Sequence, residues 1–301
     1  MALAGLVTLL IVTGCGRDTA EDRQVRIATG SKTAVYFKIG EAYGGIIDRE
    51  LPGTDASVLV TAASAANMDL VTRGQAEVGF AQSDVLVTGG APAPGLVALA
   101  RVYDDLLHLV VRADSPVKGL GGLKGRRVSV GAQGSGTTVT VGRLLSVAGM
   151  ADAVQRRDLN LDESIRSLRS GDIDAFFFSG GLPVTGIKEL GADAGIRIVD
   201  LSEWAGELRE AYSDVYVVRD VPTSAYSLPP VATIAVPNLL VVAATMPEDL
   251  AYDLTRLLME RRGELAAAHP AAERLELRAA ISTLPVPLHP GAARYYKSVK
   301  P

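Results

Sequence analysis

Short apolar runs that suit buried strands alternate along most of the chain with segments that have the spacing of amphipathic helices. Residues 25–29, 58–61 and 78–81 are predicted strands, and between them apolar residues recur three and four positions apart. This alternation is typical of parallel α/β structure, in which helices cover the faces of a sheet. The pattern restricts the chain to α/β folds and predicts an initial βαβαβ unit.

A second α/β unit is expected after residue 112. Its predicted strands are 127–130 and 173–178, and a predicted helix at 161–170 lies between them. The segments 73–80 and 170–177 share one order, namely a helix end, a glycine, an acidic link and a buried strand. Glycine at a helix end is common in α/β proteins. The shared order of the two segments is therefore compatible both with the ordinary repetition of α/β units and with two paired lobes.

The N-terminal segment resembles a bacterial lipoprotein signal. Its apolar run of about 14 residues is too short to cross a bilayer as a helix, and Val12-Thr13-Gly14-Cys15 places small residues before a cysteine. We therefore expect residues 1–14 to be a signal peptide, although no Lys or Arg precedes the apolar run, and residues 15–24 to form a lipidated tether. Cys15 is the only cysteine, so the mature chain is expected outside the cytoplasm without disulfides. The alternative for Cys15 is an ordinary thiol.

Composition limits the possible functions. The chain has 301 residues with 48% hydrophobic and 21% charged content, enough to bury two cores of ordinary size. A formal net charge of −4 and the lack of any run of five basic residues argue against nucleic acid as a partner. Aromatic residues make up 5% of the chain, which leaves little material for stacking bases or sugars.

Three junctions between a predicted strand and a predicted helix gather small polar residues. They are Thr29 to Ala34, Thr61 to Asn67 and Gly131 to Thr138, and none contains a carboxylate. In open α/β sheets ligands bind beyond the carboxyl ends of strands, where helix N-termini present free N–H groups. The junctions therefore favour a shared anion site, to which Lys32 would add a positive charge. The alternative is ordinary N-capping at each junction, with Lys32 in solvent.

Known nucleotide and hydrolase motifs do not fit the third junction. Thr137 stands where a Walker motif requires Lys, Gly134-Ser135-Gly136 lacks the third glycine of a dinucleotide fingerprint, and Gln133 occupies a glycine position of the nucleophile elbow. The three histidines lie far apart, and Asp104-Asp105 is expected to be a solvated link. We therefore expect neither an enzyme nor a bound metal or other cofactor.

These junctions and several flanking motifs together resemble the TRAP-associated extracytoplasmic immunogenic (TAXI) family of solute receptors, over essentially the whole mature chain. The order and spacing of the motifs are specific, although no single motif is. The chain departs from the family pattern at Ser31-Lys32, which replaces glycines, and at residues 62–67. The motifs are Ile27 to Gly30, Val35 to Phe37, Val78 to Asp84, Val128 to Thr137, Ile173 to Phe177 and Pro287 to Tyr296.

The resemblance implies a periplasmic-binding-protein-like α/β fold of type II, with two lobes joined by a hinge and the ligand cleft between them. We expect residues 25–111 and 222–301 in lobe 1 and residues 112–221 in lobe 2. Hinged closure would bring groups of both lobes onto the ligand.

The function implied is that of an extracytoplasmic receptor of a TRAP-type secondary transporter. It would capture a small carboxylate such as glutamate, glutamine, 2-oxoglutarate or a related dicarboxylate and deliver it to a membrane permease subunit, expected to be a fused one. The alternative is a binding protein of an ABC importer or sensor kinase for another small organic anion. By resemblance the ligand positions are Tyr36, Gln82, Ser135, Thr137 and Thr138, and the junctions, strand ends and presumed hinge add Ser31, Ser64, Asn67, Ser83, Gly136, Ser179 and Tyr226.

Overall fold

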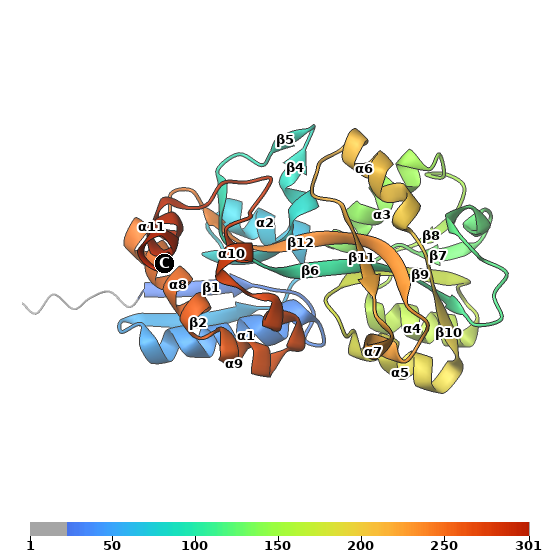
Figure 1. The fold of residues 1–301 in the computed structure, drawn as a ribbon, viewed down its shortest axis with the longest axis horizontal. Coiled ribbons are helices and arrows are strands. Elements are labelled where there is room, and N and C mark those ends of the chain that lie inside the picture. Colours follow the sequence, from blue (N-terminus) through green and yellow to red (C-terminus); the bar gives the residue numbers. More distant parts are fainter. Residues whose placement is uncertain (1–22, 301) are drawn as a thin grey trace, which may run out of the picture.

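Two lobes lie side by side along the long axis of the molecule in a computed structural model that describes residues 23–300 (Figure 1). Two long strands, β6 (Leu96–Arg112) and β12 (Val231–Ala243), run through both lobes. All main strands belong to one twisted sheet with the order β2-β1-β3-β12-β6-β9-β7-β8, to which β10 adds beside β6 and β11 beside β12. The predicted signal peptide and Cys15 lie outside the described residues, and the last two residues of the predicted tether already belong to β1.

The first lobe is built on three parallel strands, as the sequence predicted. The order β2-β1-β3 places β1 between its two neighbours, and α1 buries Ile39, Tyr43 and Ile47 against this sheet. The C-terminal helices cover the same face. The elements are β1 (Arg23–Ala28), α1 (Val35–Glu50), β2 (Thr54–Leu59), α2 (Ser64–Thr72), β3 (Val78–Gln82), the 3-10 turns η1 (Ser83–Leu86) and η4 (Pro270–Arg274), the hairpin β4 (Val87–Thr88) and β5 (Ala91–Pro92), α8 (Glu248–Glu260), α9 (Arg262–Ala268), α10 (Leu277–Ala280) and α11 (Pro290–Ser298).

The second lobe repeats the parallel core and adds two antiparallel strands. Strand β7 lies between β9 and β8, and helices cover both faces of the sheet. The elements are the 3-10 turns η2 (Leu120–Leu123) and η3 (Ser202–Trp204), β7 (Arg127–Ser129), α3 (Gly136–Val147), β8 (Gln155–Arg157), α4 (Leu161–Ser170), β9 (Ala175–Gly180), α5 (Thr185–Ala194), β10 (Ile196–Val199), α6 (Ala205–Ala211), β11 (Val217–Val221) and α7 (Thr223–Tyr226).

The paired segments of the sequence occupy equivalent places in the two lobes. Gly74 and Gly171 both adopt positive φ angles, of 66° and 80°, as residues that end helices often do. In the first lobe the acidic residue that follows, Glu77, forms an ion pair with Arg26 of β1 at 2.6 Å. In the second lobe the equivalent pair joins Asp174 to Arg127 of β7 at 3.0 Å. The shared order of the two segments therefore reflects two lobes of the same construction.

The hydrophobic cores show where one lobe gives way to the other. Leu99 and Leu240 belong to first-lobe clusters, whereas Leu107 and Val236 are buried with second-lobe residues. The chain thus passes between lobes inside β6 and β12. We place the boundaries near residues 105 and 237, rather than at 111 and 222 as the sequence suggested, because an unbroken strand carries no local signal of the crossing.

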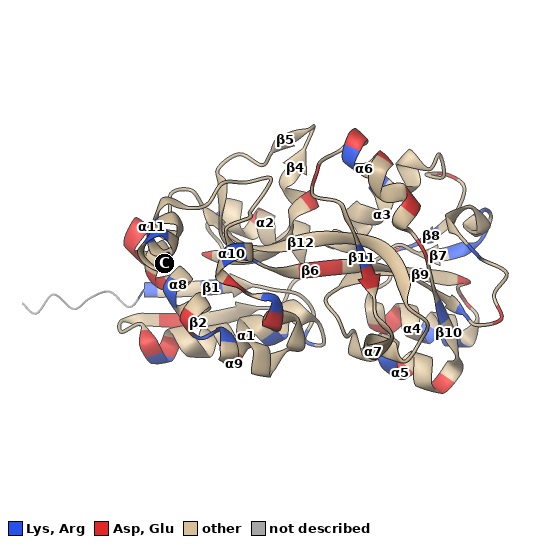
Figure 2. Ribbon diagram, viewed as in Figure 1, with Lys and Arg blue, Asp and Glu red and all other residues tan. Residues whose placement is uncertain are grey.

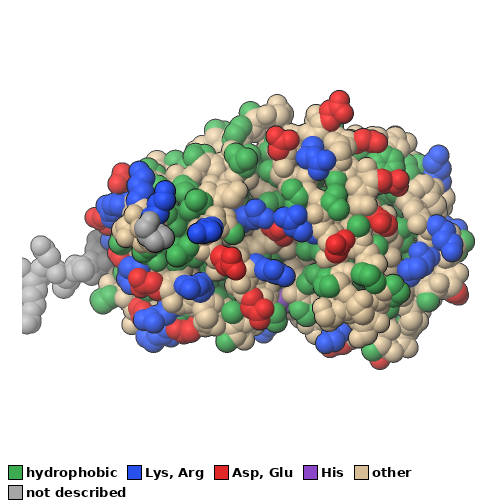
Figure 3. All heavy atoms as spheres, in the orientation of Figure 1, with side chains coloured by type: hydrophobic (Ala, Val, Ile, Leu, Met, Phe, Trp, Pro, Cys, Tyr) green, Lys and Arg blue, Asp and Glu red, His purple; other side chains and the backbone are tan. Residues whose placement is uncertain are grey.

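The surface carries charges of both signs. Lys and Arg lie among Asp and Glu on both lobes (Figure 2), and the face in Figure 3 shows the same mixture. Within residues 23–300, no helix has the length and apolar character needed to cross a bilayer.

Candidate functional site

A cavity of about 390 Å³ lies between the lobes, at the carboxyl ends of the parallel strands of both; we call it the interlobe cavity. Residues that end or follow β1, β2 and β3 line it from the first lobe, and residues that end or follow β7, β8 and β9 line it from the second. Ligands of open α/β sheets bind at this edge. The lining consists of Gly30, Ser31, Thr33 to Tyr36, Thr61 to Ser64, Gln82, Tyr103, Asp105, Gly131, Ala132, Ser135 to Thr137, Leu159 to Leu161 and Phe178 to Gly180.

Four helices begin at this cavity. The residues before α1 and α2, Ala34 and Ala63, have no side chain that caps the first turn. By contrast, Ser135 Oγ accepts a hydrogen bond from the backbone N–H of Thr138 in α3, and Asn160 forms a capping box with Glu163 in α4. Uncapped first turns leave backbone N–H donors free for another acceptor. The first-turn N–H groups of α1, and those of α2 other than the Ala65 N–H, therefore suit an oxyanion.

The strained residue Ala63 is part of this wall. Its φ angle of 80° lies in a region that residues with a Cβ seldom adopt, and such a conformation costs about 1–3 kcal/mol. The backbone N–H of Ala63 donates to Thr61 Oγ1 at 2.9 Å, and the N–H of Ala65 donates across the cavity to Gly134 O at 3.2 Å. The start of α2 is therefore held by contacts from both lobes.

Aromatic rings form the wall nearest β6. The ring of Tyr36 stacks on Phe80 with centroids 5.2 Å apart and lies 6.4 Å from the ring of Tyr103. The Tyr36 hydroxyl donates to Asn238 Oδ1 and lies 3.2 Å from Ser64 Oγ. These contacts fix Tyr36 at the point where β12 passes between the lobes.

The two lobes touch across the interlobe cavity. Gln82, at the end of β3, donates from Nε2 to Ser179 Oγ on β9 at 2.6 Å, and both side chains are buried. The Gln82 side chain lies directly over Gly136, where a Cβ atom would come within 1.6 Å of Gln82 Oε1. Thr137 Oγ1 accepts a hydrogen bond from the backbone N–H of Ser179 at 3.1 Å, which fixes the end of β9 against the start of α3. The two lobes are thus in direct contact at the cavity, and we call this arrangement the closed structure.

The charge of the lining is unusual for an anion site. Among residues 23–300, no Lys or Arg lines the interlobe cavity, and Asp105 is the one carboxylate that does. Burial raises the pKa of the Asp105 carboxyl to about 7. The Asn238 side chain acts against this rise, and the nearby carboxylates of Asp104 and Asp84 add to it. Positive potential must therefore come from helix N-termini.

Eight of the twelve predicted ligand positions line the interlobe cavity. These eight come from five different strand-to-helix junctions or strand ends, so the fold does bring the predicted junctions together. Lys32, which follows one of them, is exposed and does not line the cavity. The eight are Ser31, Tyr36, Ser64, Gln82, Ser135, Gly136, Thr137 and Ser179.

The other four predicted positions lie outside the cavity lining, and three of them make hydrogen bonds within one lobe. Asn67 is fully buried, and its Nδ2 donates to the carbonyl oxygens of Thr29 and Phe80 at 2.6 and 2.8 Å. Thr138 Oγ1 donates to Ala132 O at 2.6 Å, and Ser83 is buried in η1. These side chains do not line the cavity.

Tyr226, the fourth, lies in the core of the second lobe rather than at the cleft. Its hydroxyl lies 2.9 Å from His108 Nε2 and accepts from the backbone N–H of Val184 at 3.1 Å. Burial lowers the pKa of His108 to about 4, so the imidazole is neutral at pH 7. Its Nε2 atom accepts a hydrogen bond from the Tyr226 hydroxyl, and its Nδ1 atom lies 3.2 Å from Phe178 O. Tyr226 therefore joins α7 to β6.

Sequence reasoning missed several lining residues, Asp105 above all. The expectation that Asp104-Asp105 is a solvated link is wrong for Asp105, which is 5% exposed within β6. Tyr103 and Phe178 were also missed, because apolar strand residues give no local sign of facing a cleft. Asn160 could have been found, since it precedes a predicted helix in the same way as the three junctions used.

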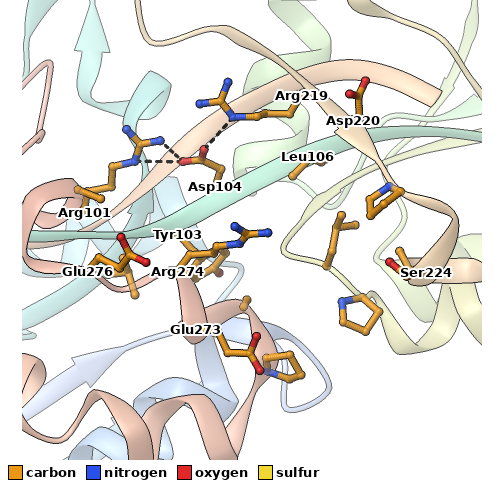
Figure 4. Close-up of a pocket in the computed structure, with 18 residues that line it drawn as sticks. Arg101, Tyr103, Asp104, Leu106, Arg219, Asp220, Ser224, Glu273, Arg274 and Glu276 are labelled. Carbon is orange, nitrogen blue, oxygen red and sulfur yellow. Dashed lines mark hydrogen bonds and ion pairs between the residues drawn. The ribbon is translucent and has the colours of Figure 1, made fainter. Parts of the chain in front are cut away.

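A second cavity, of about 570 Å³, lies between the lobes on the opposite face of β6; we call it the hinge-side cavity (Figure 4). Three of its charged groups interact with one another, since Asp104 binds Arg101 and lies 3.6 Å from Arg219, whereas Arg274 lines the cavity without a described ion pair. Residues of η4 and α10 line it from the first lobe, and β11 and α7 line it from the second. No carboxyl end of a parallel first-lobe strand reaches it. The interlobe cavity is therefore the better candidate.

Residues 27–299, nearly all of the described chain, match the model of the NMT1-like family. The chain belongs to the NMT1-like family. It is accordingly an extracytoplasmic solute-binding protein, related to ligand-binding components of transporters rather than to enzymes.

Solved structures support the fold of this NMT1-like protein. A protein of Bordetella bronchiseptica RB50 is 22% identical, with a TM-score of 0.56 over 93% of this chain and 91% of that one. The periplasmic aliphatic sulphonate binding protein SsuA of Escherichia coli is 16% identical, with a TM-score of 0.52 over 93% and 84%. A putative L-cystine ABC transporter protein of Listeria monocytogenes is 10% identical, with a TM-score of 0.55 over 84% and 95%. The predicted type II periplasmic-binding-protein fold is confirmed.

Proposed function

We propose that this NMT1-like protein captures a small carboxylate, such as glutamate, glutamine, 2-oxoglutarate or a related dicarboxylate, in the interlobe cavity. The observation that carries the proposal is the convergence of four helix N-termini, two of them without a side-chain cap, on one cavity between the lobes. Helix N-termini bind oxyanions through free N–H groups and the macrodipole. The hydroxyls of Ser31, Ser64 and Ser135 supply further donors in the same cavity.

The size of the interlobe cavity is consistent with a small acid. A volume of about 390 Å³ equals the volume that about a dozen water molecules occupy in the liquid. That volume accommodates a five-carbon dicarboxylate and lies at the small end of the range for ligand pockets, about 300–1,000 Å³. Gln82 and Ser179 contact each other from opposite lobes, so ligand binding and closure reinforce one another.

A screen by thermal unfolding tests this proposal. Residues 17–301 would be heated with dicarboxylates of four and five carbons, amino acids, 2-oxo acids, sugars and nucleotides. A ligand at 100 times its Kd adds about 2.7 kcal/mol to the stability, enough to raise Tm by several degrees. A response confined to acids supports the proposal, and a response confined to sugars or nucleotides contradicts it.

For the membrane partner we propose a TRAP-type permease driven by an ion gradient, on the basis of the TAXI-like motifs. An ABC importer is the second candidate, because solved proteins of the same fold include ABC transporter components. Uptake of the screened acid by cells that carry the receptor separates the two. An ionophore that collapses the ion gradients would stop TRAP-type uptake while ATP is maintained, whereas ATP-driven uptake would continue.

We also propose that the mature chain is anchored through an acylated Cys15. Cells fed a radiolabelled fatty acid should label the protein, and Cys15→Ser should remove the label. A protein with the serine that still carries the label would contradict the anchor.

A further inference from the structure

Asp105 is the feature of the interlobe cavity that an anion receptor does not require. The side chain comes from β6, at the crossing between the lobes, and is 5% exposed. Its Oδ1 atom is buried without a hydrogen-bond partner, although the residue lines the cavity. A buried carboxylate normally has a cation or several donors beside it, since an unpaired charge is costly to bury.

The groups around Asp105 do not supply that cation. The charged and titratable groups that act on it or face it are the carboxylates of Asp104 and Asp84 and the phenols of Tyr36 and Tyr103. The Asn238 amide lies beside the carboxyl and lowers its pKa, but it is neutral and supplies no counter-charge.

The arginines on the far side of β6 are already engaged. Arg101 and Arg219 both pair with Asp104, on the face of the strand that lines the hinge-side cavity. Asp104 and Asp105 therefore differ in surroundings although they are adjacent in the chain. Only Asp105 faces the interlobe cavity without a positive partner.

The interlobe cavity is thus polarised. The N-termini of α1 and α2 provide a positive potential on one part of its wall, and the Asp105 carboxylate provides a negative potential at β6. A ligand carboxylate placed against Asp105 would be repelled. An ammonium group placed there would supply the missing counter-charge of Asp105 and form a charge-assisted hydrogen bond with it.

We propose that Asp105 recognises a cationic nitrogen of the ligand, and that this receptor therefore selects small zwitterions that combine an ammonium group with an oxyanion. This proposal rests on the proposed capture of an acid and specifies that the same ligand also carries an ammonium group. It favours amino acids over 2-oxo acids and simple dicarboxylates of the same size.

Matched pairs of compounds test the inference. L-Glutamate with glutarate, L-alanine with propionate, and taurine with ethanesulfonate differ within each pair by the amino group alone. We expect the amine to improve affinity at least tenfold in one or more pairs, measured by calorimetry at pH 8. Asp105→Asn should cancel that preference. Asp104→Asn, which removes the same charge on the opposite face of β6, should keep it within about threefold.

The pH dependence of binding gives an independent readout. An ammonium ligand drives deprotonation of Asp105, whose pKa in the closed protein is raised to about 7. The Kd of the preferred amine should therefore fall between pH 5.5 and 7.5, with proton release seen in buffers of different ionisation enthalpy. Both effects should vanish in Asp105→Asn.

The outcomes separate this inference from the proposed function. If no amine binds better than its amine-free match, the inference is overturned, and binding of the amine-free acids then still supports a carboxylate receptor. A Kd that rises with pH also overturns it, because a protonated Asp105 would then be donating to the ligand. If n-butylamine, which lacks an oxyanion, binds as tightly as the zwitterions, recognition of an amine by Asp105 is supported, whereas the selection of zwitterions and the capture of an acid are both contradicted.

Discussion

Gly136→Ala should weaken ligand binding without weakening the fold. An alanine Cβ at position 136 would lie 1.6 Å from Gln82 Oε1, 2.5 Å from Cδ and 3.0 Å from Cγ. The Gln82 amide would have to turn away and would lose its 2.6 Å hydrogen bond to Ser179. Both groups are buried in the closed structure, and a buried polar group left unpaired costs about 1–3 kcal/mol. Because this contact joins opposite lobes, its loss destabilises the closed structure relative to an open one. Ligand binding requires the closed structure, so we expect Kd to rise about 5- to 150-fold.

The stability of the lobes should change little or rise. Gly136 begins α3 with an ordinary negative φ angle, and replacing glycine by alanine in a helix stabilises it by up to about 1 kcal/mol. Gly142→Ala is the matched control, since it lies in the same helix and a Cβ there would contact nothing within 4 Å. Calorimetry with the tightest acid of the screen and unfolding of the ligand-free proteins would measure both effects. Equal affinities of the two variants would refute the assignment of Gly136 and Gln82 to the closing surface.

Three further predictions follow from the described contacts. Because the pKa of Asp105 is raised from 3.8 to about 7, the native state holds this proton more tightly than the unfolded state; the resulting stability is present below pH 4 and is lost as pH rises through 7, by up to about 4 kcal/mol. Urea unfolding of ligand-free protein at pH 5 and 8 should show about 3 kcal/mol of this loss, since about two of the pH units lie in that interval, and an equal loss in Asp105→Asn would disprove it. Tyr226→Phe should lower the free energy of unfolding by about 1–3 kcal/mol, because His108 and the Val184 N–H lose their hydrogen-bond partner. It should leave the ligand Kd unchanged, and a large change in Kd would show that Tyr226 belongs to the binding site. Arg274→Ala, in the hinge-side cavity, should leave Kd within about twofold in calorimetry, and a loss of binding would move the site to that cavity.

The sequence predicts the architecture and one half of the site well, for a physical reason. Strand ends and helix starts carry local signals, so the junctions near Tyr36, Ser64 and Ser135 could be recognised, and parallel strands necessarily bring their carboxyl ends to one edge. The side-chain direction within a junction is a tertiary property. Asn67 follows Ser64 closely in the chain, yet it points into the first lobe and satisfies backbone carbonyls there.

The features that the sequence did not reveal lie where the chain crosses between lobes. Asp105 interrupts an apolar strand, and its burial depends on β12, β9 and the first turn of α1 coming together around β6. Tyr226 lies next to several prolines, which suggested a hinge, but the same segment packs on His108 in the second lobe. The contacts of β12 with Asp105 and of Tyr226 with His108 join residues more than a hundred positions apart, and β9 and α1 lie about 70 positions from Asp105. No local pattern extends over such separations.

A crystal structure with the tightest-binding acid of the screen tests the central claim most directly. The account predicts density for the acid in the interlobe cavity, with an oxyanion at the first turns of α1 and α2 and contacts from both lobes. Density in the hinge-side cavity around Arg274, or an acid that contacts one lobe alone, would contradict it.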